Sequence, residues 1–265
     1  VMDSVAKTSE YTVTCKALGI KLMPPDINAG EYGFTAIRSG EGHGVVLYGL
    51  TAIKGVGRTV VEDIVAERNE RGTFKDMEDF VQRMPDSVNR KAIEGFIKSG
   101  AFDSFDGNRR QKLILIDELL EEASARKRSD IAGQLTLFDI ASDEDKQSFK
   151  HKLADVPEFE KDELLAYEKE AAGIYLSGHP MDNYADICNK IVTAWSKDYL
   201  PDEHTGVCRY GEGDELISAG VVTECKFKYT KTNKQMAFLT IEDIYGQLSV
   251  LVFPDSFEKN RELIT

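Results

Sequence analysis

The spacing of apolar residues changes near residue 216, and this change limits the folds open to the chain. From residue 46 to about 125, apolar side chains recur at helical spacing, as in the run from Val88 to Lys98, which predicts an all-helical region. After Leu216, apolar and polar residues alternate, which predicts strands at 216–229, 234–244 and 247–253. Because 265 residues suffice for about two domains, we expect an α+β multi-domain chain that is mostly helical and ends in a β-sheet domain.

Start and stop signals place the helices more closely. The Pro24–Pro25 pair forbids a helix at that point. Farther along the chain, Glu168 is expected on a helix face that water covers. Helices are expected from Ser9 to about Gly19, from Thr73 through Val81, over 88–98 and 108–128, from Pro157 until Gly178–Pro180, and from Phe257 onward.

Composition excludes several classes of protein. No apolar run approaches the ~18–20 residues that cross a membrane, and the first residues lack a signal-peptide core. The cysteines, Cys15, Cys188, Cys208 and Cys225, show no CxxC spacing, which argues against a zinc site and fits a reducing cytoplasm. The net charge of −13 counts against indiscriminate nucleic-acid binding but permits a local basic patch. The start at Val1, close to a first helix, suggests a fragment of a longer protein.

A glycine hairpin stands between two helical runs in LTAIKGVGRTVVEDIV. Gly55 and Gly57 bracket Val56 and permit a tight turn, after which the N–H groups that open the second helix suit a phosphate. Lys54 and Arg58 flank this point. The pattern resembles the helix-hairpin-helix motif, whose contacts go to backbone phosphates regardless of sequence. The alternative is a helical corner without a ligand. The hairpin carbonyls could also hold a monovalent cation.

A second, weaker hairpin follows in IEGFIKSGAFDSFDGNRRQKLILI. Gly100 would form its turn, and two such hairpins usually pack as one unit. Its polar edge would be Lys98, Asn108, Arg109 and Arg110.

The strand region combines cations with aromatic rings, which single-stranded DNA binders use for phosphates and bases. Its strand order resembles the start of an oligonucleotide-binding (OB) fold, with three of the usual five strands. The alternative is a hairpin whose lysines protect a sheet edge. The predicted single-strand contacts are Lys226, Phe227, Lys228, Tyr229, Lys231, Lys234 and Phe238.

An apolar stretch, QLTLF, lies within a polar run whose composition predicts a linker. It resembles the bacterial sliding-clamp-binding peptide, with Gln134 for orienting hydrogen bonds and Leu135, Leu137 and Phe138 as pocket anchors. The entropy cost of ordering the linker would offset much of the free energy gained by burying these side chains, so we expect roughly micromolar affinity for the clamp. The alternative is a latch on the chain's own surface.

Six stretches together carry a wider resemblance. KLMPPDIN, YGLTAIKGVG, IKSGAFD, GQLTLF, YEKEAAGIYLSGHPMDNY and ISAGVVTECK occur in one order. This order resembles the later part of the C-family bacterial replicative polymerases, the DNA polymerase III alpha subunits, and covers essentially the whole chain. The hairpin unit before the OB domain is similar to the type that lacks an inserted exonuclease.

The resemblance implies a layout and partners. The parent would be a Mg²⁺-dependent DNA-directed DNA polymerase, whose metal-binding aspartates have no counterpart here, so we expect no catalytic residue, metal site or cofactor in this chain. The implied partners are double- and single-stranded DNA, the beta sliding clamp and other replisome subunits. The implied domains are 1–45 (end of the fingers), 46–125 (tandem helix-hairpin-helix), 126–155 (linker with the clamp motif), 156–209 (helical connector) and 210–265 (start of the OB domain).

Two other classes compete with this interpretation. A non-enzymatic assembly scaffold with helical and OB-like domains fits the acidic net charge. A helix-hairpin-helix glycosylase would need a catalytic Lys or Asp just after the hairpin, where Arg58 and Thr59 stand instead.

Overall fold

The computed structural model describes residues 11, 12, 14, 15, 18–38, 44–84, 88–131, 151–201 and 205–264, with backbone only for 126–131. The chain divides into two compact units, one of Cys15–Ser177 and one of Val1–Thr14 with Gly178–Thr265. This division falls inside the predicted connector, and the predicted domain bounds themselves stay predictions. In the described ranges, no helix is both long and apolar enough to span a bilayer.

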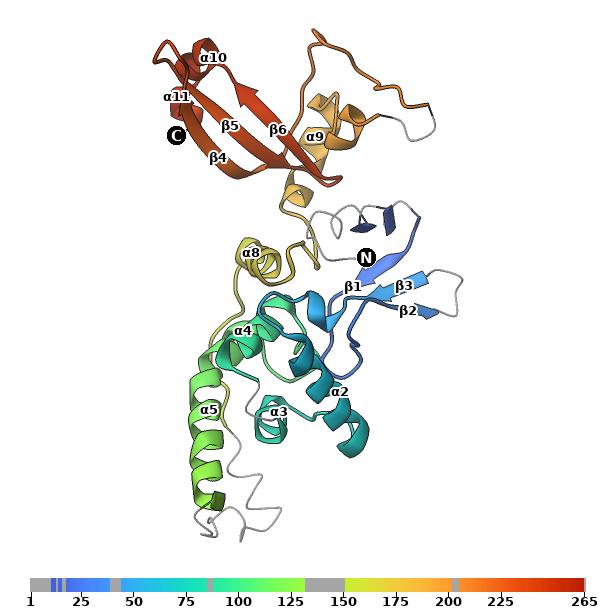
Figure 1. Cartoon of the computed structure of the whole chain (residues 1–265), viewed down its shortest axis with the longest axis vertical. Coiled ribbons are helices and arrows are strands. Elements are labelled where there is room, and N and C mark those ends of the chain that lie inside the picture. Colours follow the sequence, from blue (N-terminus) through green and yellow to red (C-terminus); the bar gives the residue numbers. More distant parts are fainter. Residues whose placement is uncertain are drawn as a thin grey trace. The chain divides into compact units, whose positions relative to one another are not determined.

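The larger unit is built from helices (Figure 1). They pack around edge-to-face phenylalanine rings, among them Phe80, Phe96 and Phe102, which are fully buried. Local signals fix the ends of α4, since the Asn89 side chain accepts the N–H of Ala92 and Gly100 ends the helix at a positive φ. The elements are η1 (Leu50–Ala52), α2 (Arg58–Arg71), α3 (Met77–Arg83), α4 (Arg90–Ser99), α5 (Arg109–Ile131) and α8 (Lys161–Ala172).

A small sheet belongs to the same unit. Strand β3 (Gly44–Leu47) pairs in parallel with β1 (Lys21–Met23) and antiparallel with β2 (Thr35–Arg38). After β3, the buried Tyr48 hydroxyl donates to the Ala172 carbonyl at 2.7 Å, and burial raises the Tyr48 pKa to about 12. The sequence predicts no strand here and predicts helix from residue 46, although β3 extends to Leu47, because strands this short carry little periodic signal.

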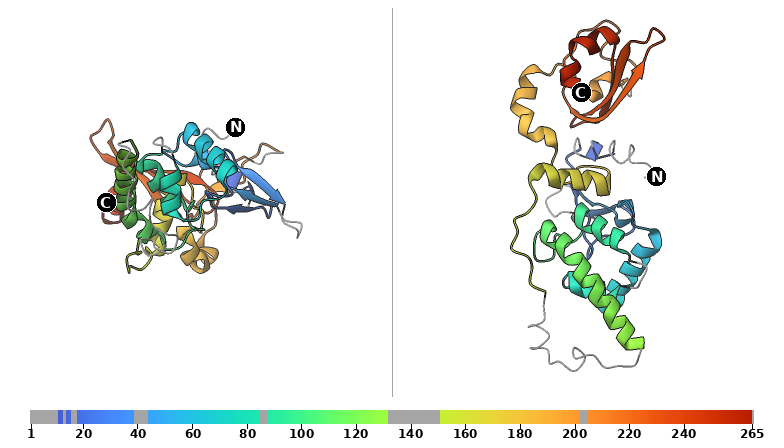
Figure 2. Two further views of the ribbon diagram at one scale, coloured as in Figure 1. Left: turned by 90° about the horizontal axis from the view of Figure 1, so that it is seen from below. Right: turned by 90° about the vertical axis from the view of Figure 1, so that its left-hand side faces the viewer.

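The smaller unit contains an antiparallel sheet. Its strands β4 (Val221–Tyr229), β5 (Gln235–Glu242) and β6 (Gln247–Val252) lie in the order β4-β5-β6. Helix α10 (Pro254–Lys259) lies against one sheet face, where its buried Phe257 meets the Phe227 ring (Figure 2). The other elements are η2 (Pro180–Tyr184), α9 (Ala185–Ile191), η3 (Ser196–Tyr199) and α11 (Arg261–Ile264).

The three predicted strands and the long helix after Asn108 are confirmed, although β4 begins at Val221 and not at Leu216, and several helix bounds were wrong. Helix α3 begins at Met77, because the Asp76 side chain caps it. Helix α8 begins at Lys161 and ends at Gly173, at φ 79°. Helix α10 begins with Pro254, before Phe257, since proline fits a first helical position.

The OB fold is not confirmed. The described residues form two three-stranded sheets and no closed barrel. The coarser expectation, a helical hairpin unit together with a small β-sheet region, is confirmed.

Candidate nucleic-acid interface

The first hairpin has a turn that only glycine adopts easily. Gly55 lies at φ +84°, and Gly57 is the N-cap of α2, with no side-chain cap among the described residues. Val56 is buried and fixes the loop to the core, whereas Lys54, Gly55, Gly57 and Arg58 are exposed. The start of a 14-residue helix therefore faces outward.

Two cations border this helix start. Lys54 precedes the turn, and the Arg58 side chain is 82% exposed while it pairs with Glu62 at 3.1 Å. The Arg58 guanidinium also lies over the Tyr32 ring, 5.9 Å from its centroid. The positive end of the helix dipole and two exposed cations thus share one surface, which suits an anion.

The rear of the hairpin is supported by other helices. The Lys54 N–H donates to the Ala171 carbonyl of α8 at 2.7 Å. Gly95 of α4 packs so closely that an added Cβ would lie 3.3 Å from the Lys54 carbonyl oxygen. The Leu50 carbonyl accepts the N–H of Ile53, and the Ile53 carbonyl accepts the N–H of Val56. The monovalent cation expected on the hairpin carbonyls stays a prediction.

The glycine of the second hairpin has a similar positive φ, but it lies among buried residues. Gly100 lies at φ +85° but is buried, and Arg109 is only 7% exposed. The Arg109 guanidinium donates to Asp103 at 2.6 Å and to Glu168 at 3.1 Å. Burial alone would lower the Arg109 pKa, but these carboxylates raise it. The guanidinium is therefore engaged inside the chain.

Glu168 corrects the expectation of a fully solvated face on α8. Its side chain is 0% exposed, and its second carboxylate oxygen accepts the N–H groups of Leu176 and Ser177. A buried carboxylate requires such partners. The sequence signal for this burial is weak, because a glutamate on a helix is exposed in most proteins.

The N-terminus of α5 already holds an anion. Both carboxylate oxygens of Glu158 accept backbone N–H groups there, from Arg109 at 2.9 Å and Arg110 at 3.2 Å. Burial would raise the Glu158 pKa, but these bonds and that from the Phe159 N–H lower it. Sequence reasoning missed this residue, which lies 49 positions beyond Arg109.

The rest of the second polar edge is partly free. Asn108 caps α5 by accepting the Gln111 N–H at 2.8 Å. Lys98 pairs with Glu170 at 2.8 Å and lies over the Tyr167 ring. Arg110 is exposed and stacks over Phe159, 5.5 Å from its centroid.

In the smaller unit, the predicted cations and rings of β4 separate. Successive side chains of a strand point to opposite faces, so Lys226 and Lys228 share one face while Phe227 and Tyr229 take the other. The ring of Phe238 lies on the lysine face, with the Lys228 ammonium 4.9 Å from its centroid. Phe227 instead packs on Phe257 of α10.

The remaining cations are exposed near the hairpin end. Lys231 lies in the β4–β5 turn, and Lys234 contacts Asp255 at 3.4 Å. Together, Lys226, Lys228 and Phe238 form what we name the lysine face.

Comparison with known proteins bears on both units. Residues 19–112 match a family model described as a helix-hairpin-helix motif. A DNA polymerase III subunit alpha of Borreliella burgdorferi is 36% identical over 97% of the chain, and that of Bacillus subtilis (strain 168) is 37% identical over 98%. That of Escherichia coli (strain K12) is 30% identical over 99%.

The chain is homologous to a region of DNA polymerase III subunit alpha. It spans about a fifth of the length of these relatives, 21% or 22% of each. Both compact units fall within the matched region, since the matches cover nearly all of the chain. The helix-hairpin-helix match contains both hairpins up to the start of α5.

The predicted clamp motif of this DNA polymerase III homologue, Gln134, Leu135, Leu137 and Phe138, lies outside the described residues. It stays a prediction.

Proposed function

We propose that this chain is part of a bacterial replicative DNA polymerase, and that its first hairpin binds the sugar-phosphate backbone of duplex DNA. One observation carries this proposal: an uncapped helix start on an exposed turn, between Lys54 and Arg58. Homology to DNA polymerase III subunit alpha supplies the context.

The binding mechanism follows from the geometry of the hairpin. The N–H groups at the start of α2 donate to phosphate oxygens, and the flanking cations displace counterions from the DNA. Val56 and the Lys54–Ala171 hydrogen bond hold the loop in place, so little ordering is required on binding. No base edge is read, because such contacts reach only the backbone.

The second hairpin contributes less directly. Its Gly100 and Arg109 are buried, so we propose that they shape the unit on which the first hairpin stands. Among the residues of its polar edge, the exposed Arg110 is our candidate for a phosphate contact, with Lys98 and Asn108 at its margin.

A paired substitution tests the first hairpin. Arg58 and Arg71 both lie on α2 and both pair with a glutamate one turn away, Glu62 and Glu67 respectively, but Arg71 stands at the far end of the helix. We expect Lys54→Ala with Arg58→Ala to weaken binding of a labelled DNA duplex and to lower the salt slope of log K by about 2.

Arg71→Ala is the matched control and should leave affinity and slope unchanged in the same fluorescence anisotropy titration. Equal losses in both variants would show a diffuse charge effect, and the hairpin proposal would be withdrawn. The alternative, an assembly scaffold, is favoured by the exposed Ile187 and Ile191 of α9. It predicts no salt-dependent DNA binding by the unsubstituted chain or by either variant.

We propose further that Gln134, Leu135, Leu137 and Phe138 bind the beta sliding clamp. A weak clamp contact and weak DNA contacts reinforce each other through effective concentration, which suits a processive replicase with other replisome partners. Calorimetric titration with the clamp should show micromolar binding that Gln134→Ala with Phe138→Ala abolishes. Undiminished binding by that double variant would overturn the assignment.

The lysine face is our candidate for single-stranded DNA, as the beginning of an OB domain. The ring of Phe238 would stack with a base while Lys226 and Lys228 meet phosphates. Phe238→Ala should weaken binding of an oligothymidylate by about 1–3 kcal/mol. Phe227→Ala alters the opposite face, and an equal effect there would contradict the face assignment.

A further inference from the structure

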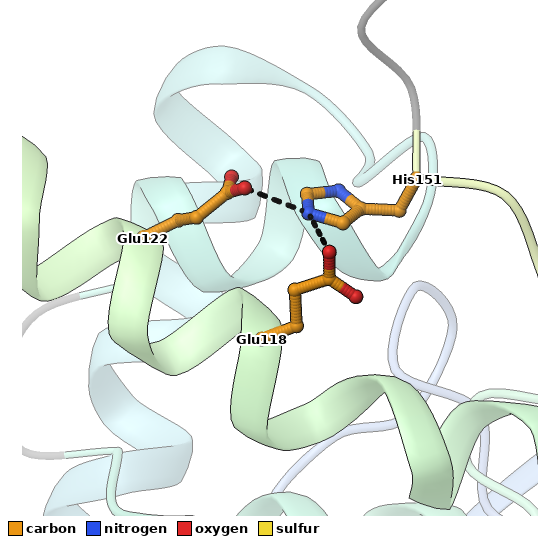
Figure 3. Close-up of side chains that lie close together, drawn as sticks. All are labelled: Glu118, Glu122 and His151. Atoms are coloured by element: carbon orange, nitrogen blue, oxygen red, sulfur yellow. Dashed lines mark hydrogen bonds and ion pairs between the residues drawn. The ribbon is translucent and has the colours of Figure 1, made fainter.

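Three ligand-type side chains of the larger unit meet beside α5 (Figure 3). Glu118 and Glu122 stand one turn apart on this helix, and His151 reaches them from the segment before α8. The His151 Nε2 atom is 3.0 Å from a Glu122 oxygen and 3.6 Å from a Glu118 oxygen. The three ligand atoms all lie within 4.8 Å of one another.

The imidazole is held from its other side as well. Its Nδ1 atom is 3.5 Å from a carboxylate oxygen of Glu78 on α3, and the His151 side chain is only 8% exposed. When the ring proton is on Nδ1, Glu78 accepts it and the Nε2 lone pair faces the oxygens of Glu118 and Glu122. In this tautomer the lone pair and the two oxygens repel unless a cation lies between them, whereas a proton on Nε2 is donated to Glu122.

The charges also favour a cation. Three carboxylates face the imidazole, and a divalent ion neutralises more of their charge than a single proton on the ring does. Burial would lower the His151 pKa, but the carboxylates of Glu122 and Glu78 raise it, in accord with the negative charge around this position.

We propose that Glu118, Glu122 and His151 bind a divalent transition-metal ion of the zinc type, with Glu78 as a positioning residue. Zinc bonds of about 2.1 Å in tetrahedral geometry place ligand atoms about 3.4 Å apart, and the two distances from Nε2 bracket this value. Two carboxylates with one imidazole suit zinc and its neighbours. The Glu118 and Glu122 side chains are 65% and 47% exposed, so water completes the coordination.

The ion would join α5 to the chain that follows residue 150. Glu122 and His151 are 29 positions apart, and in the folded unit the metal links them through bonds that the unfolded chain lacks. Binding to the folded state alone raises stability by mass action. The site would therefore be a structural metal site that stabilises the fold, and it is distinct from the proposed DNA surface at Gly55–Arg58.

The experiment uses Co²⁺ as a spectroscopic probe and Zn²⁺ as its competitor. Cys208 and Cys225 are exposed free thiols that would also bind these ions, so both are first changed to serine. In this background we expect one Co²⁺ per chain, with visible absorption of nitrogen and oxygen ligation, displaced by Zn²⁺, and a raised unfolding temperature with either ion.

Glu118→Gln with Glu122→Gln should abolish both the absorption and the thermal shift. Glu78→Gln should weaken the Co²⁺ affinity by about 10-fold or more. Glu121→Gln is the matched control on the same exposed stretch of α5 and should bind as the parent does. Failure of the parent to bind either ion, or equal binding by the double variant, would overturn the site.

Discussion

Gly55 and Gly100 have nearly the same φ, +84° and +85°, yet their surroundings differ. The first glycine is exposed and leads into an uncapped helix with exposed cations. The second is buried, and its nearest cation, Arg109, is bonded to Asp103 and Glu168. Glu158 occupies the helix start that a phosphate would otherwise fill.

This difference shows that a glycine hairpin only permits an anion site. The conformation exposes helix N–H groups, and the rest of the chain decides which anion meets them. At the second hairpin that anion is an internal carboxylate, so the motif serves stability. At the first hairpin the position is open to an external phosphate.

The largest expected effect concerns the closed hairpin. Arg109→Met removes the guanidinium that pairs with the fully buried Glu168 and leaves that carboxylate with its two backbone N–H donors. A buried charge without a countercharge costs about 3–5 kcal/mol. Urea unfolding should show this loss in the free energy of unfolding, while DNA affinity of the folded fraction persists. A loss of DNA binding at unchanged stability would make Arg109 a DNA contact and break the comparison.

The two glycines themselves provide the next test. A Cβ at Gly100 would collide with the Arg109 guanidinium, whereas a Cβ at Gly55 would lie 3.3 Å from the flexible end of Lys91. Both alanine variants carry the backbone strain of about 1–2 kcal/mol. Gly100→Ala should therefore lower the unfolding temperature more than Gly55→Ala does, as thermal denaturation followed by circular dichroism would show. Equal shifts in unfolding temperature would mean that the contacts around each glycine do not determine the cost of the substitution.

The two exposed arginines sharpen the contrast in DNA binding. Arg58 stands beside an open helix start, and Arg110 beside one that Glu158 fills. We expect Arg58→Ala to lower the salt slope by about 1, and Arg110→Ala by less, in duplex titrations over a range of salt concentrations. The reverse order would place the main phosphate contact at the second hairpin.

The smallest effect concerns acid stability. Because the Glu158 pKa is lowered in the folded chain from its ordinary value of 4.5, its contribution is present above that value and is lost as the pH falls through the folded pKa. Glu158→Gln should cost about 1 kcal/mol at neutral pH and flatten the stability profile below pH 4.5. Parallel profiles for both proteins would show that the carboxylate does not stabilise the helix start.

The sequence predicted local features well and long-range partners poorly. The glycine turn at Gly55, the long helix after Asn108 and the alternating strands follow from short-range periodicity, and the structure reproduces them. The role of Arg109 depends on Glu158 and Glu168, which lie far along the chain. The sequence places Phe227 next to Lys226 and Lys228, but consecutive strand residues face opposite sides of the sheet, so its ring packs on Phe257 instead.

The hydrogen bond between Lys54 and Ala171 has a mechanical meaning. Ala171 lies in the last turn of α8, and the Glu168 carboxylate of the same helix holds the N–H groups of Leu176 and Ser177, where the first compact unit ends. The backbone of the Gly55 turn is therefore anchored to the same helix that fixes Leu176 and Ser177, so a displacement of α8 would move both together.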